Sequence, residues 1–500
     1  MTAIPALPFL VPAILEALCI SNEYKHLVEV VPGEADSYCA RLVNSNGGII
    51  LTGDSDLLVH DLGADGAVVF FKDLQVSSEP AGGMSGLVFK PSDIAERLSL
   101  CDPVGLLHLA FEMSLDPNIT FRKAVDKAKS LASAIAHPKD FEKFSQEYMP
   151  LSIGQGYQHR DTPGIDSVLK LLDPRISEVV LQYPRFALLA RLPLEEVLAS
   201  PHVFLPVLLD SPIRTNAWEI SASVRQLAYG LLNFVVPDGE HKPTVFEHRR
   251  QQEKAGGREM QLPVTSELPE ACAAFLEIDA QIEARLPGLS ELKHWTALAV
   301  HQEMAWSHLN SKISLAEATI RGLISAKNKI EVVEGLSKQA RLKNGSSAIE
   351  NVVSEIGQLE KVENPTDELS WDATHFLAQI QGSYYSCRLL KQIIELVVVS
   401  HIPGKPLPEI IFKLHRRLQA LPSLQEYPSF RDSWSFLTDI NRLGMVEASK
   451  DILGIVEPKI TEPAKEKKIS KKKRKRDRSS TKAPENSKKS SNPFDLLAVE

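Results

Sequence analysis

The sequence predicts an α/β domain with a parallel sheet, followed by a large, mostly α-helical region and a disordered basic tail. Apolar runs alternate with helical spacing in the first 75 residues, and helical spacing dominates beyond residue 91. Residues 461–500 hold 13 Lys and Arg against 6 Asp and Glu, a net +7, while the 500-residue chain carries −8. An acidic body and a basic tail are therefore expected.

The N-terminal part alternates between the two periodicities. The expected elements are a helix at 9–19, a strand at 26–31, a helix at 34–46, a strand at 49–52, a turn or short helix at 54–59 and a strand at 67–71. Two glycines after Asn46 are typical of a helix end. Strand, helix and strand at this spacing indicate a parallel sheet.

Helical periodicity then continues through most of the chain. The strongest candidates are 103–113, 120–137, 166–182, 218–234, 269–285, 292–311, 346–359, 371–399 and 408–421. The polar and basic segment 239–261 is expected to be an exposed loop, and the chain from about residue 458 loses its apolar residues and is expected to be disordered. The predicted domains are residues 1–135, 150–457 and 458–500.

Cysteine usage and hydropathy exclude several classes of protein. The five cysteines are scattered and form no C-x-x-C pair, which argues against a disulfide framework or a zinc site. No stretch reaches the roughly 18 consecutive apolar residues that a membrane helix needs, so no membrane partner is expected.

Two pairs of carboxylates each follow an apolar segment. Glu34 and Asp36 come after Val-Val-Pro-Gly, and Asp54 and Asp56 come after Ile-Leu-Thr-Gly. Because ligands of open α/β sheets bind at the carboxyl ends of strands, we expect the four acids to share one edge. Carboxylates hold Mg²⁺, so the pattern predicts a metal site for phosphodiester hydrolysis. The competing interpretation, stronger for either pair alone, is that acids simply favour helix starts and turns.

The same stretches, PGEADSYCA at 32–40 and LTGDSDLLV at 51–59, resemble the internal region of the XPG/flap endonuclease family, which has a PIN-like fold. The resemblance implies that Glu34, Asp36, Asp54 and Asp56 are catalytic ligands of two Mg²⁺ (or Mn²⁺) ions that support structure-specific cleavage of DNA. It makes Asp116 a weaker fifth ligand. The segment VFLPVLLDSP at 203–212 and the helix after it are similar to the asteroid branch of the family.

Two departures from the family pattern oppose that function. Family members begin well before this motif and supply two further aspartates and the first strand from that part, so the chain is expected to be truncated at its N-terminus or to have lost activity. The stretch from Asp116 to Lys123 has no glycine, unlike the family's helix–two-turn–helix motif. The alternative to an endonuclease is therefore a degenerate nuclease fold that serves as a nuclear nucleic-acid- or protein-binding scaffold or adaptor.

The tail holds two short motifs. A cluster of basic residues predicts nuclear import, and non-specific contact with a phosphate backbone is compatible with it. Its members are Lys471, Lys472, Lys473, Arg474, Lys475 and Arg476. The apolar island from Asn492 to Leu497 indicates a docking segment for a protein partner, with chance as the alternative. Nucleic acid, DNA in preference to RNA, is the other expected partner.

Overall fold

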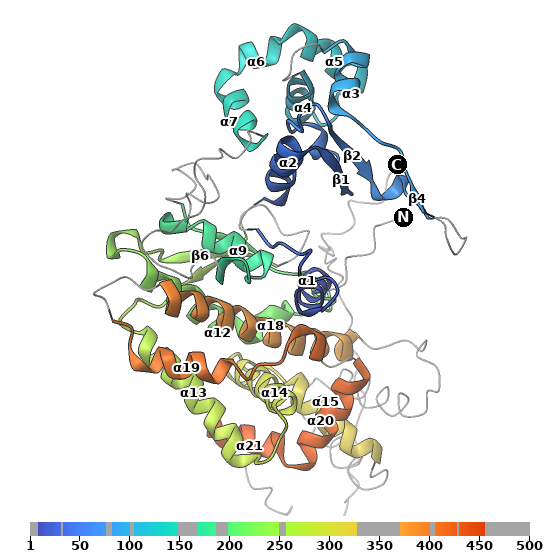
Figure 1. The fold of residues 1–500 in the computed structure, drawn as a ribbon. Helices are drawn as coiled ribbons and strands as arrows, with labels where there is room; N and C mark the ends of the chain where they lie inside the picture. The colour runs from blue at the N-terminus through green and yellow to red at the C-terminus, as the bar shows by residue number, and fades with distance from the viewer. Residues whose placement is uncertain are drawn as a thin grey trace, which may run out of the picture. The chain divides into compact units, whose positions relative to one another are not determined.

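The computed structural model describes residues 9–31, 34–76, 83–100, 105–148, 168–186, 199–249, 257–327, 371–400, 406–427 and 430–455 (Figure 1). Residues 34–148 form what we call the α/β lobe. The described residues from 168 to 455, together with the first helix, form what we call the helical body. The predicted order of a parallel α/β part followed by a large helical region is confirmed.

The sheet of the α/β lobe is built from the predicted helix and strands. Helix α2 (Ala35–Asn46) leads through Gly47, whose φ of +68° is natural for glycine, into β1 (Gly48–Thr52). Strand β1 pairs in parallel with β2 (Gly66–Phe70), from Gly48 opposite Gly66 to Thr52 opposite Phe70. One apolar core joins α2 to this sheet and contains Ala40, Val43, Ile50, Leu57, Leu62, Val68 and Phe70.

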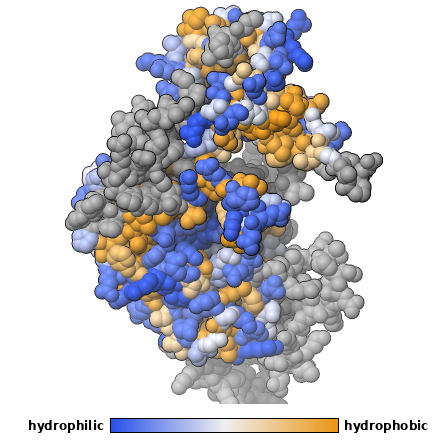
Figure 2. Space-filling model, in the orientation of Figure 1, coloured by the Kyte–Doolittle hydropathy of each residue, from blue (hydrophilic) through white to orange (hydrophobic). Residues whose placement is uncertain are grey.

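The strand predicted at 26–31 is wrong. Residues 22–27 form turns, residues 28–31 have no regular structure, and Leu27 is 71% exposed. Within the described ranges β1 pairs with β2 alone. Ile49 and Leu51 lie on the face of β1 opposite to the buried Ile50 and are 61% and 44% exposed. A parallel strand needs a neighbouring strand, and residues 28–31 pair with none within the described ranges. Hydrophobic surface is visible on this lobe in Figure 2.

Short elements complete the lobe. They are η1 (Asp56–Leu58), η2 (Phe71–Asp73), β3 (Gln75–Val76), β4 (Met84–Ser85), α3 (Pro91–Leu98), α4 (Gly105–Leu115), α5 (Phe121–Ser130), α6 (Ala132–Ala136) and α7 (Pro138–Tyr148). The single helix predicted at 120–137 is divided at Leu131, which adopts φ +53°. A small second core packs α5 on α4 through Leu109, Ala124, Val125 and Ala128.

The helical body surrounds one long helix, α18 (Trp371–Ser400), which packs against α12, α14 and α19. Its other helices are α1 (Leu10–Ile20), α9 (Pro174–Leu181), η3 (Ala217–Ser221), α12 (Ala222–Leu231), η4 (Leu232–Val235), η5 (Asp238–Glu240), α13 (Leu268–Arg285), α14 (Glu291–Leu309), α15 (Leu315–Lys327), α19 (Glu409–Leu418), η6 (Leu424–Glu426), α20 (Phe430–Arg442) and α21 (Met445–Ile452). Among the described helices, none has the length and apolar character to span a membrane.

Most of the predicted helices of this region are present. Among the described residues, the helix expected at 166–182 is interrupted: residues 168–169 are helical, a turn follows, and α9 begins at Pro174. Proline fits the first helical turn, and the Asp173 side chain caps α9 by accepting from Arg175 N at 3.0 Å. Helix α1 belongs to the body, since Phe9 stacks on Tyr385 at 4.9 Å between ring centroids. The helix predicted at 346–359 lies outside the described residues.

The loop predicted at 239–261 is wrong in part. Residues Thr244–His248 form β6 and Arg258–Gln261 form β7, an antiparallel pair, and β6 also pairs in parallel with β5 (His202–Phe204). Polar and basic residues suggested solvent exposure, but Glu247 and Arg249 turn inward and are 0% and 2% exposed.

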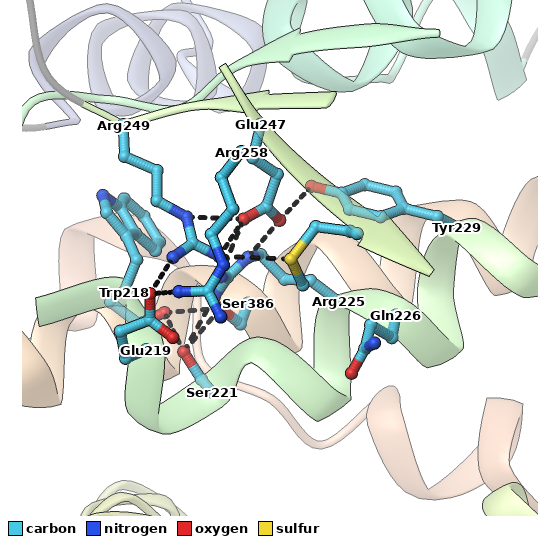
Figure 3. Close-up of polar contacts among 12 residues, drawn as sticks. Trp218, Glu219, Ser221, Arg225, Gln226, Tyr229, Glu247, Arg249, Arg258 and Ser386 are labelled. Carbon is cyan, nitrogen blue, oxygen red and sulfur yellow. Dashed lines mark hydrogen bonds and ion pairs between the residues drawn. The ribbon is translucent and has the colours of Figure 1, made fainter. Parts of the chain in front are cut away.

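A buried ion-pair network explains why these charged residues face inward (Figure 3). The Arg225 guanidinium from α12 donates two hydrogen bonds to Glu247, from Nε to Oε1 at 2.6 Å and from Nη2 to Oε2 at 3.1 Å. Arg249 donates to Glu247 at 2.7 Å and to Glu219 of η3 at 2.5 Å. The charges of Glu247 and Arg249 are therefore neutralised inside the protein, and their ion pairs connect the sheet to α12 and η3.

Candidate functional site

The first pair of predicted site residues lies at the start of α2. Glu34 occupies the N-cap position with extended backbone (φ −74°, ψ 116°), and Asp36 lies in the first turn. Negative charge is favoured there by the helix dipole. Glu34 is exposed and Asp36 is half-buried, so both carboxylates are accessible from the same end of the helix.

The second pair lies just beyond the carboxyl end of β1. The backbone N–H of Asp54 donates to Thr52 Oγ1 at 3.0 Å, and that of Asp56 donates to Asp54 Oδ1 at 3.2 Å. Leu57, 1% exposed, anchors this turn in the core, so its neighbours Asp54 and Asp56 face solvent. The turn thus presents two carboxylates at the strand end, as expected for an open α/β sheet.

The two pairs lie close enough to repel each other. Burial raises the pKa of Asp36, and the negative charges of Glu34, Asp54 and Asp56 raise it further. Burial also raises the pKa of Asp56, with a further contribution from Asp54. Carboxylates from two separate segments are therefore near enough to raise one another's pKa.

Positive charge does not compensate this cluster within the described part of the chain. Across those ranges, none of the four carboxylates forms an ion pair with Lys or Arg. Four uncompensated hard oxygen donors fit a divalent cation such as Mg²⁺, which would reverse the repulsion. Among the described residues, however, no group of three or more His, Cys, Asp or Glu side chains is close-set enough to hold an ion by itself. Water or substrate oxygens would have to complete the coordination of a bound ion.

Tyr148, at the end of α7, borders the same cluster and was not identified from the sequence. Burial, followed by the charges of Asp56, Glu147, Asp54 and Asp36, raises the pKa of Tyr148 to about 12, so its hydroxyl is a neutral donor at physiological pH. The only signal for it in the sequence is the helical spacing of aromatic residues before it.

Two side chains hold Tyr148 in place. His60, which is 6% exposed, packs its ring 5.1 Å from the Tyr148 ring and hydrogen-bonds to the Tyr148 backbone. Burial is the main cause that lowers the pKa of His60, although this hydrogen bond acts against it. The Phe144 ring lies 5.1 Å from the Tyr148 ring.

The weaker fifth candidate is placed differently. Asp116 follows α4, is exposed, and accepts from Asn118 N at 3.0 Å in a local turn. Its charge is not among those that raise the pKa of Asp36 or Asp56. The described structure therefore brings together Glu34, Asp36, Asp54 and Asp56 but gives no sign of Asp116 among them. The basic cluster 471–476 and the segment 492–497 lie outside the described residues.

Comparison with known proteins gives one match. A family model described as "XPG domain containing" matches residues 6–262, which is just over half of the chain. No curated protein and no solved structure matches the chain. The matched region contains the whole α/β lobe with its four carboxylates, and it extends through β5, β6 and β7 of the helical body.

Proposed function

The chain belongs to the family of XPG-domain-containing, nuclease-like proteins, and from that premise we propose that it is an endonuclease of the asteroid branch that requires Mg²⁺ or Mn²⁺ and acts on DNA. One observation carries the proposal: four uncompensated carboxylates from α2 and from the end of β1 converge in the matched region. Mg²⁺, when bound, supplies Lewis-acid chemistry suited to phosphodiester hydrolysis.

In this proposal, different residues bind the cation and contact the substrate. Glu34 and Asp36 hold the cation from the helix start, and Asp54 and Asp56 hold it from the strand end. The hydroxyl of Tyr148, which stays protonated at physiological pH, is available to donate to a phosphate oxygen at the border of the cluster. Exposure of Glu34, Asp54 and Asp56 leaves room for a large substrate.

Helix α5 supports a nucleic-acid substrate. Its inward face packs on α4 through Ala124, Val125 and Ala128. Its exposed positions carry Arg122, Lys123 and Lys129, and also Lys127, which pairs with Glu112 of α4 at 3.7 Å; the single exposed acid on α5 is Asp126. A cationic surface in the same lobe as an acidic cluster suits a polyanion that must also reach a cation site.

Removal of positive charge from α5 is expected to weaken DNA binding equally for all DNA sequences. Replacing Lys123 and Lys129 by glutamine should lower the slope of log K against log salt by about one for each of these lysines that binds a phosphate. The measurement is anisotropy of labelled DNA across a salt series in EDTA. Lys90→Gln, a change outside α5, is the control; equal slopes for wild type, the double variant and this control would show that α5 does not touch phosphate.

The proposed activity is tested on the wild-type chain. Branched and single-stranded DNA should be cut in Mg²⁺ or Mn²⁺, and the cleavage should stop in EDTA and return when the metal is restored. Product formation that is unchanged in EDTA would contradict a metal-dependent reaction. Parallel RNA substrates determine whether DNA is preferred.

A non-enzymatic scaffold is the second candidate function. It is favoured by the absence, among the described residues, of a close-set group of three metal ligands. On this view the fold is a degenerate nuclease that binds nucleic acid or protein. Tight DNA binding with no metal-dependent cleavage of any substrate would support the scaffold over the endonuclease.

The C-terminal motifs extend either proposal. Lys471–Arg476 would direct the protein to the nucleus, where DNA is available. Asn492–Leu497 would dock a protein partner, as an adaptor does.

A further inference from the structure

The three-stranded sheet of the helical body has two chemically different faces. Its inward face carries Val203, Val245 and Glu247, all fully buried. Because side chains alternate along a strand, the residues between and beside them point the opposite way. The outward residues of β5 and β6 that carry rings are His202, Phe204, Phe246 and His248.

These four outward side chains form one continuous stack of rings, which we call the ring ladder. Phe246 and His202 lie 5.2 Å apart between centroids with planes 21° apart, and His202 and His248 lie 5.1 Å apart at 20°. His248 and Phe204 lie 4.3 Å apart at 11°. The rings alternate between the two strands, so the ladder runs along the sheet face and ends at Phe204.

The two imidazoles in the middle of the ladder are joined by a hydrogen bond. His202 Nδ1 and His248 Nε2 are 2.8 Å apart, which requires that one ring donates and the other accepts. Burial lowers the pKa of His202, and the neighbouring His248 lowers it further. Gly257, with φ +62°, lets the returning chain pass His248, because a Cβ there would lie 3.0 Å from the His248 ring.

The edge of β5 and the end of the ladder at Phe204 differ in access. The strand edge beside it is closed, since the Gln182 side chain accepts from His202 N and donates to His202 O, both at 2.7 Å. An added β-strand therefore cannot pair with β5 at that residue. Phe204, by contrast, is 49% exposed although its ring has a stacking partner on one face.

We propose that the ring ladder binds single-stranded nucleic acid, with an unpaired base stacking on Phe204 as the next ring of the series. Every base has a flat π-face, and such stacking tolerates any sequence. A duplex keeps its bases stacked on one another, so a single strand is the fitting form.

The test uses the full chain, EDTA, and a 20-nucleotide single strand that carries 2-aminopurine, whose fluorescence is quenched on stacking. Phe204→Ala should raise the dissociation constant roughly 5- to 100-fold and abolish the quenching. Phe204→Trp should preserve both. Ile213→Ala is the matched control, because Ile213 is 92% exposed on the loop after β5 and should leave binding unchanged.

The outcomes separate this inference from the proposed function. Asp54→Ala should slow cleavage by about a hundredfold or more and leave the quenching intact, because the ladder does not use the acidic cluster. Equal quenching by wild type and Phe204→Ala, or binding by wild type without quenching, overturns the inference even if cleavage is found. Melting temperatures of the variants show whether a loss of binding reflects a loss of fold.

Discussion

Replacement of Glu247 by alanine is expected to lower the free energy of unfolding by roughly 3–5 kcal/mol, since it leaves buried cations without their partner. Arg225 and Arg249, 0% and 2% exposed, both donate to this carboxylate, as does the Tyr229 hydroxyl at 3.1 Å. Glu247→Gln keeps the shape but removes the charge, so it should also destabilise the protein. Urea unfolding followed by circular dichroism measures both variants.

Glu259 provides the matched control for this substitution. It lies on the neighbouring strand β7, opposite Phe246, and is exposed. Exposed polar contacts contribute little to stability, so Glu259→Ala should change the free energy of unfolding by less than about 0.5 kcal/mol. If Glu247→Ala were no more destabilising than this control, the buried network would not hold the sheet.

The same residue should make stability depend on pH in the acid range. Burial alone would raise the pKa of Glu247, but Arg225 and Arg249 outweigh it and lower this pKa from 4.5 to about 2. The unfolded chain then takes up the proton first. The stabilisation by Glu247 is complete above pH 4.5 and is lost as the pH falls toward 2. In Glu247→Gln this part of the acid dependence should be absent.

This network shows which part of the fold the sequence could not predict. The residues from 239 to 261 are polar, and polarity locally favours a loop. Their burial depends on distant partners: Arg225 comes from α12, and its Nη1 also donates to Ser386 of α18 at 2.9 Å. Local patterns predict helices and strands whose burial follows from their own residues. They do not predict a strand whose charges are neutralised by residues from elsewhere in the chain.

At the candidate site of the α/β lobe, too, local features were predictable and long-range contacts were not. The turn with Asp54 and Asp56 was predictable because Gly53, the strand before it and Leu57 fix it within a few residues. Tyr148 could not be assigned, since its place beside the cluster depends on His60, far away in the sequence. The strand at 26–31 failed for the same reason, because its apolar pattern finds no partner strand among the described residues.

The carboxylate cluster is tested most directly by Asp54→Ala, which should lower the rate constant for Mg²⁺-dependent cleavage by about a hundredfold or more. Asp54 contributes negative charge to both Asp36 and Asp56, so its loss removes one oxygen donor and relieves the repulsion on the others. Without metal, this relief is opposed by loss of the hydrogen bond from Asp56 N to Asp54 Oδ1, so the melting temperature of the variant should stay close to that of wild type.

Asp65→Ala is the control for that experiment, because Asp65 is an exposed aspartate on the turn before β2, outside the cluster. It should cut DNA at the wild-type rate. Added Mg²⁺ should raise the melting temperature of wild type and of Asp65→Ala, and should do so less for Asp54→Ala, since a cation that binds only the folded state stabilises it. Equal cleavage and equal thermal response in all three proteins would mean that Asp54 does not hold a catalytic ion. DNA binding without cleavage by any of the three would instead support the scaffold.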